Sequence, residues 1–186
     1  MVDKNSIPDY CGQDFGIYYE KVKKDFENVK QEFPLLQITL LPTVKPKEIY
    51  IRGLLINKRL IEVCSKTVDI KRRSIEILAI YPSDFPNSEI VVEDLRGKIK
   101  WSEIPKEHRH RNKYKNGREV LCTHHPNGEI NEIPFEKRTI MILNSAWNLY
   151  YQYKSYLKSR NWTLQDLPHG IEGDKQLKQE KRFYEK

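Results

Sequence analysis

The sequence predicts an α+β domain, and three features carry this prediction. A segment with helical periodicity at residues 15–33 precedes four extended segments between residues 36 and 95, and a second helical segment follows at residues 135–160. We expect the extended segments to form a four-stranded antiparallel meander. The 186 residues suit one compact domain at 14–165, with an N-terminal tail at 1–13 and a charged C-terminal tail at 166–186.

The first helix is predicted by apolar residues that recur at steps of three and four, with lysines and glutamates between them. These apolar residues are Phe15, Tyr18, Tyr19, Val22, Phe26, Val29 and Phe33. Pro34 cannot continue a helix, so we expect the helix to end before it.

The four extended segments are residues 36–41, 48–56, 68–81 and 89–95. Apolar residues at positions 75, 77, 79 and 81 alternate as in a half-buried strand, while Leu78 and Ile80 indicate that the other face is covered as well. A turn-rich stretch at residues 81–86 separates the third segment from the fourth.

Residues 96–131 are polar, carry four of the five histidines and show no clean periodicity. A long stretch of this kind inside a compact domain is more often functional than idle. The second helix follows Pro134 and is expected at residues 135–160. Its predicted apolar stripe is Ile140, Leu143, Trp147, Tyr150 and Leu157.

Composition limits the function classes. The net charge of +7 permits an acidic partner or nucleic acid without requiring either, and we do not expect nucleic acid. The three cysteines are widely spaced and odd in number, so free thiols in a reducing cytoplasm are predicted. The sequence shows neither a signal peptide nor a run of the roughly 18 apolar residues that a membrane span needs. We therefore expect a soluble cytoplasmic protein without a membrane partner.

The segment from His110 to Cys122 is the strongest candidate for chemistry. It sets a cysteine after a His-x-Asn tripeptide, which ends at Asn112, and after the Asn-Gly turn at residues 116–117. A thiolate attacks activated carboxyl derivatives readily, and an upstream amide can hold the loop or stabilise the oxyanion that forms on attack. Cys122 is therefore the predicted nucleophile.

These motifs resemble those of ubiquitin-conjugating enzymes. The stretch Tyr81-Pro-Ser-Asp-Phe-Pro86 is similar to the family's Tyr-Pro-x-x-x-Pro turn between the third and fourth strands. The tripeptide at residues 110–112 resembles the family's His-Pro-Asn, and residues 116–122 resemble its Asn-Gly-x-Ile-Cys segment. The resemblance covers roughly residues 14–162 and implies the ubiquitin-conjugating-enzyme fold.

Two departures from the family pattern matter. Arg111 replaces the proline of the tripeptide, and the interval from His110 to Cys122 is longer, by about two residues, than the family usually has. A literal His-Pro-Asn occurs at residues 125–127, but no cysteine follows it. We treat that second copy as a coincidence or a loop element.

The second helix extends the resemblance. Its aromatic run at residues 147–153, followed by Trp162, is similar to that of bacterial relatives encoded beside cGAS-like nucleotidyltransferases in antiphage (CBASS) systems. Core packing explains the same aromatic residues. The family's chemistry would place a protein C-terminus on Cys122 as a thioester and pass it to an amine, with no cofactor. Asn112 would act near the oxyanion or as a loop strut, and His110 would be structural.

The implied partners follow from this chemistry. The acyl donor would be a ubiquitin-like protein or the C-terminus of a cGAS-like nucleotidyltransferase. Because the sequence shows no adenylating domain, a separate activating enzyme is expected to supply the activated donor, unless the donor arrives by an unusual route. Thr123 and His124 follow the cysteine, where we looked for an acidic residue, so the base that deprotonates the incoming amine is unassigned.

Nearby positive charge suggests a hypothesis about the thiol. Arg118, His124 and His125 lie close to Cys122 in the sequence, and positive neighbours lower a thiol pKa. We therefore expect alkylation of Cys122 to show a midpoint below that of a free thiol. Cys64 is predicted to be a small core residue, and Cys11 an incidental thiol in a tail.

Two other functions stay open. The first is a zinc site, or a histidine-rich nuclease site, that would draw on His108, His110, Cys122, His124 and His125. The residue types suit zinc, but their spacing fits no familiar pattern of paired ligands. The second is a catalytically inactive conjugating-enzyme-like scaffold that binds a partner through this loop.

Overall fold

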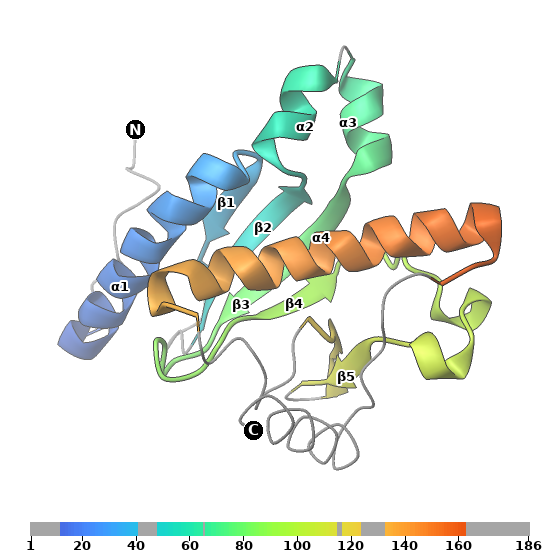
Figure 1. The fold of residues 1–186 in the computed structure, drawn as a ribbon. Helices are drawn as coiled ribbons and strands as arrows, with labels where there is room; N and C mark the ends of the chain where they lie inside the picture. The colour runs from blue at the N-terminus through green and yellow to red at the C-terminus, as the bar shows by residue number, and fades with distance from the viewer. Residues whose placement is uncertain (1–11, 41–47, 65, 115–116, 124–132, 163–186) are drawn as a thin grey trace, which may run out of the picture. The chain divides into compact units, whose positions relative to one another are not determined.

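The computed structural model describes residues 12–40, 48–64, 66–114, 117–123 and 133–162. The chain forms two compact units, Met1–Arg96 and Gly97–Lys186, which we describe separately. Figure 1 shows the helices and strands of both units. None of the helices in the described ranges is long and apolar enough to cross a membrane.

The first unit is an antiparallel sheet with one long helix, α1 (Gly12–Glu32), on it. Its strands are β1 (Leu36–Thr39), β2 (Ile49–Leu55), β3 (Ile75–Tyr81) and β4 (Val91–Asp94). Each strand pairs with the next in the order β1-β2-β3-β4. The predicted meander is therefore confirmed. The first helix is confirmed too, although it begins at Gly12, within the stretch predicted as a tail.

One face of this sheet is apolar and buried. β3 alternates buried residues with half-buried ones from Ile75 to Ala79, as its sequence predicted. On the other face Ile80 is buried and Leu78 half-buried, so that face is covered at this strand as well. The buried residues of these two strands are Ile49, Ile51, Leu55, Ile75, Ile77, Ala79, Ile80 and Tyr81. Burying one such large side chain contributes about 1.5–3 kcal/mol, so this face dominates the stability of the unit.

Buried hydrogen bonds fix α1 on the sheet. The Tyr18 hydroxyl donates to the Tyr81 carbonyl at 2.6 Å and accepts from the Ile49 N–H at 3.0 Å. The Tyr81 hydroxyl donates in turn to the buried carboxylate of Asp25. Because a buried polar group without a partner is costly, these bonds define the position of the helix along the strands.

Gly53 is required where β1 meets β2. It pairs with Leu36, and its φ of +150° is a conformation that side chains rarely adopt. A Cβ at this position would lie 2.2 Å from the carbonyl oxygen of Leu35. The close approach of the two backbones therefore depends on the absence of a side chain.

The prediction of a strand at residues 68–81 was wrong in its first half. Residues Thr67–Arg73 form helix α3, and only Ile75–Tyr81 are extended. The strand begins at Ile75 because its partner β2 ends at Leu55, opposite that residue. A basic run at residues 71–73 occupies the last turn of α3, where positive charge complements the helix dipole.

A second short helix, α2 (Lys58–Val63), was not predicted. Asn57 caps it, since its side chain accepts a hydrogen bond from the Arg59 N–H at 2.9 Å. The Asn57 amide also contacts Glu32 at the end of α1. α2 and α3 follow β2 and precede β3, beyond the end of those strands in Figure 1.

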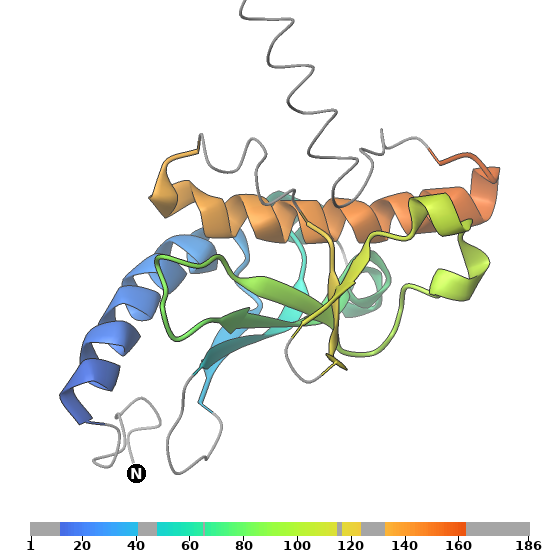
Figure 2. The same ribbon diagram turned by 90° about the horizontal axis from the view of Figure 1, so that it is seen from below.

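The second unit contains a short hairpin and one long helix. The hairpin strands are β5 (Arg111–Lys113) and β6 (Glu119–Leu121), and the helix is α4 (Phe135–Ser159). Two 3-10 turns, η2 (Trp101–Glu103) and η3 (Lys106–His108), lie beside the C-terminal end of α4 in Figures 1 and 2. The helix was predicted to within one residue, but the stretch at 96–131, expected to be irregular, contains this hairpin and both turns.

The buried face of α4 is offset from the predicted stripe. Leu143 and Tyr150 are buried as expected, whereas Ile140, Trp147 and Leu157 are half-buried. The buried residues of this helix are Thr139, Ile142, Leu143, Ala146, Leu149, Tyr150, Gln152 and Tyr153.

Polar contacts at residues 98–103 tie the start of this unit to α4. The Tyr153 hydroxyl donates to a Glu103 carboxylate oxygen at 2.7 Å. The Lys98 ammonium lies 5.6 Å from the centre of the Tyr150 ring, within the range of a cation–π interaction.

Candidate active site

The hairpin brings together the two ends of the predicted active segment. Asn112 pairs with Val120 in the β5–β6 ladder. Beyond the strands, the Cys122 N–H donates to the His110 carbonyl at 2.9 Å, which extends the same ladder by one pair. The long interval between His110 and Cys122 is thus folded back on itself.

The turn of the hairpin absorbs the length of this interval. The Tyr114 N–H donates to the Arg118 carbonyl at 2.8 Å, and the Gly117 N–H donates to the Tyr114 carbonyl at 3.1 Å. Gly117 has a φ of +74°, in the left-handed region that favours glycine. The departure in length from the family pattern therefore does not separate Asn112 from Cys122.

Strand alternation places the three predicted site residues on one face. Successive side chains of a strand point to opposite faces, so residues 110, 112 and 122 of this paired ladder share a side. The opposite side carries an ion pair in which Arg111 Nη1 lies 2.6 Å from Glu119 Oε1. Arg111, which stands where the similar family has proline, therefore lies on the face opposite Asn112 and Cys122 and forms an ion pair there.

The Asn112 side chain acts as a hydrogen-bonding partner of the Cys122 thiol and lowers its pKa. The bond favours the thiolate because an amide N–H that donates to sulfur stabilises negative charge on it. Of the predicted site residues, Asn112 is thus the one whose side chain acts on the thiol.

The hypothesis of a lowered thiol pKa was wrong. Burial raises the pKa of the half-buried Cys122 above its ordinary value, and the bond from Asn112 lowers it only in part. Desolvation disfavours the charged form of any thiol. The Arg118 carbonyl accepts the Tyr114 N–H at the turn end of the hairpin, and the pKa of Cys122 is raised despite this residue. His124 and His125 lie outside the described residues.

His110 contributes its backbone to the site and its ring to a separate contact. Its carbonyl accepts the Cys122 N–H, while its imidazole stacks on the indole of Trp162. The structural role that the family resemblance implied for His110 stays a prediction. Sequence reasoning missed the contact, because no pattern connects two residues so far apart in the chain.

The other candidate residues are partly accounted for. Within the described ranges, no three His, Cys, Asp or Glu side chains gather in an arrangement that could hold a metal ion. Cys64 ends α2 and is half-buried, so the prediction that it is a core residue was wrong. Cys11 and the His-Pro-Asn at residues 125–127 lie outside the described residues.

The aromatic residues of the run at 147–153 in α4 divide into two groups. Tyr150 and Tyr153 are buried, as core packing predicts. Trp147 and Tyr151 stack on each other with ring centroids 5.3 Å apart, and Tyr151 is 60% exposed. Core packing therefore explains only the first group.

The Tyr-Pro turn, which lies in the first unit, is ordered by its own contacts. The rings of Tyr81 and Phe85 meet edge to face with centroids 4.7 Å apart, and the Phe85–Pro86 peptide bond is cis. The Phe85 N–H donates to the Pro82 carbonyl at 3.0 Å.

Comparisons with protein-family models, with curated proteins and with solved structures gave no match.

Proposed function

We propose that this protein is a ubiquitin-conjugating-like acyltransferase that carries a protein C-terminus as a thioester on Cys122. The observation that carries the proposal is that Asn112 and Cys122 share one face of the hairpin ladder, where the Asn112 amide lowers the pKa of the thiol. The order of elements supports it as well: a first helix, a four-stranded meander, the cysteine-bearing segment and a second helix follow one another as in the conjugating-enzyme fold.

The proposed reaction has two steps. The Cys122 thiolate attacks the carbonyl of an activated donor thioester, and the tetrahedral intermediate expels the carrier thiolate and leaves the acyl group on Cys122. An amine then attacks this new thioester, loses a proton and expels the Cys122 thiolate. Asn112 supplies an N–H donor beside the sulfur, where the oxyanion of each step forms.

A raised thiol pKa is compatible with this chemistry. It reduces the thiolate fraction at neutral pH, but the intrinsic nucleophilicity of a thiolate increases with its pKa. A donor thioester is already activated, so the barrier that the enzyme must lower is modest. In addition, a thiol that is mostly protonated resists the unwanted oxidation that a low pKa promotes.

The proposed setting is bacterial antiphage defence. The donor would be the C-terminus of a cGAS-like nucleotidyltransferase, or else a ubiquitin-like protein, and a separate activating enzyme would supply it as a thioester. This part of the proposal rests on the family resemblance of the motifs at residues 81–86 and 110–122.

Intact-mass measurement tests the proposal. The full chain is purified together with the products of neighbouring genes and weighed with and without a thiol reductant. We expect an adduct that the reductant removes, that is lost in Cys122→Ala and that persists in the matched variant Cys64→Ala. An adduct unaffected by Cys122→Ala would contradict the proposal. Unchanged partner binding without any reducible adduct would favour the inactive scaffold instead.

A further inference from the structure

Trp162 lies just beyond α4, where the chain leaves the helix. The helix ends at Arg160, which is left-handed with a φ of 57° and donates its N–H to the Tyr156 carbonyl at 2.8 Å. The Ser159 hydroxyl accepts the Asn161 N–H at 3.1 Å. These bonds turn the chain so that the rings of Trp162 and Tyr156 meet edge to face, with centroids 6.0 Å apart.

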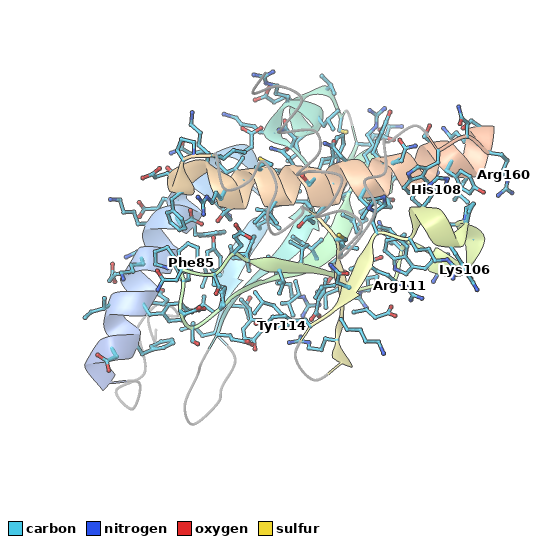
Figure 3. All side chains as sticks on the ribbon, turned by 60° about the horizontal axis from the view of Figure 1, so that its bottom comes forward. Phe85, Lys106, His108, Arg111, Tyr114 and Arg160 are labelled. Atoms are coloured by element: carbon cyan, nitrogen blue, oxygen red, sulfur yellow. The ribbon has the colours of Figure 1, made fainter. Side chains whose placement is uncertain are left out.

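Two imidazole rings stack on the Trp162 indole. The His108 ring lies 5.4 Å from it between centroids with an interplanar angle of 7°, and the His110 ring lies 6.0 Å away with an angle of 10°. Both distances fall within the range of favourable offset stacking. Figure 3 shows His108 near Arg160, at the end of α4.

The stacked histidines lead directly into the active hairpin. The His110 N–H donates to the His108 carbonyl at 3.1 Å, which makes residues 108–110 a tight turn. The His110 carbonyl then accepts the Cys122 N–H, and Asn112 follows two residues later. A ring that immobilises both imidazoles therefore restrains the backbone to which Cys122 is bonded.

We propose that Trp162 is a positioning residue for Cys122. Its flat indole holds His108 and His110, and through the His110 carbonyl it keeps the thiol against the Asn112 amide. The catalytic consequence rests on the proposed function of Cys122, whereas the restraint itself does not. The restraint requires a planar ring, so Trp162→Phe should preserve part of it and Trp162→Leu should remove it.

Hydrogen–deuterium exchange of the full chain tests the restraint without any donor. In Trp162→Leu we expect the Cys122 amide to exchange on the order of tenfold faster, because two ring stacks are lost. Trp162→Phe should lie between this variant and the wild type. The matched control is Trp147→Leu, which removes an equally large ring from within α4 and should leave the hairpin unchanged.

Two exchange results would overturn the proposal. Unchanged exchange at Cys122 in Trp162→Leu would show that the ring restrains nothing there. An equal acceleration of the α4 amides would show a general structural role instead.

The kinetics of loading, meaning the transfer of the donor acyl group to Cys122, separate this proposal from the proposed function. With a donor that loads Cys122, Trp162→Leu should lower the maximal rate and leave the half-saturating donor concentration unchanged. A change confined to that concentration, or no change at all, would contradict a positioning role. If none of the donors tested forms an adduct on Cys122 of the wild type, the proposed function fails. The exchange experiment still decides whether Trp162 restrains the hairpin.

Discussion

The sheet of the first unit and the hairpin of the second unit are both antiparallel, yet they are held in different ways. The strands β2 and β3 pair over seven residues and bury one whole face. The hairpin pairs over three residues, and all three residues of β5 are exposed. In β6, by contrast, Val120 and Leu121 are buried. The polar strand β5 gains little from burial, so it depends on the ladder and on local side-chain contacts.

This difference is typical of where proteins place chemistry. Large apolar surfaces stabilise the sheet, whereas regions with few apolar contacts open more easily and often carry the functional groups. The proposed reaction would require a hydrogen-bonding partner beside the Cys122 sulfur, and the three-residue ladder places Asn112 on the same face. Four predictions test the contrast between the sheet and the hairpin.

The largest expected effect is in the sheet, at Gly53. Gly53→Ala should lower the free energy of unfolding by about 3 kcal/mol, because the new Cβ would meet the Leu35 carbonyl and the residue would keep an unfavourable φ. Gly16→Ala is the control, since a Cβ there meets nothing within 4 Å and alanine favours a helix. Chemical denaturation measures the free energy of unfolding of both variants. An unchanged free energy in Gly53→Ala would show that β1 and β2 can move apart without loss of stability.

A smaller loss is expected in the second unit, at Tyr153. Tyr153→Phe should lower the free energy of unfolding by about 1.5 kcal/mol at neutral pH, because the hydrogen bond to the Glu103 carboxylate is lost. Burial and that bond raise the pKa of Tyr153 to about 12. The folded state therefore favours the protonated phenol, and this contribution should fade as pH rises from about 10 to 12.

Denaturation of wild type and Tyr153→Phe over this pH range measures the contribution. Convergence of the two curves at high pH is the expected result. If the difference in free energy of unfolding between the two proteins grew with pH, the pKa of Tyr153 would be lowered by folding and not raised.

The third prediction concerns the thiol. The alkylation rate of Cys122 should reach its midpoint above the pKa of a free thiol, because burial raises it. Asn112→Ala should move the midpoint further up, since the hydrogen bond that favours the thiolate is lost. Rates measured against pH with Cys11→Ala and Cys64→Ala in both backgrounds isolate Cys122. A midpoint below that of a free thiol would refute the account of burial.

The smallest effect is expected on the far face of the hairpin. Arg111→Ala should change the free energy of unfolding by only about 0.5 kcal/mol, because its ion pair with Glu119 is solvent-exposed. Loading of Cys122 should be unaffected. A large loss of loading in this variant would show that Arg111, which replaces the family's proline, matters to the chemistry.

The contrast also explains what the sequence could predict. The sheet and both long helices follow from apolar periodicity, which the chain displays over many residues. The strand error at residues 68–73 arose because Val68 and Ile70 alternate as strand residues do. Only the end of β2 at Leu55 determines that they have no strand partner.

The hairpin could be found only as a motif. Three-residue strands such as β5, which is entirely polar, carry no periodic signal. The residues Asn112 and Cys122 were identified through the chemistry of thiols and a family resemblance. The direction of the thiol pKa was wrong because neighbours in the sequence suggested charge, whereas burial decides the sign. The stacking of His110 on Trp162 is a tertiary contact that no spacing encodes.

The central claim is that Cys122 itself receives the acyl group, and a trapped ester tests it most directly. In Cys122→Ser, incubation with the activated donor should give an adduct that resists thiol reductants and is released by hydroxide. Peptide mapping should place the donor C-terminus at position 122. An adduct mapped to another residue, or a reducible adduct that survives in this variant, would contradict the account.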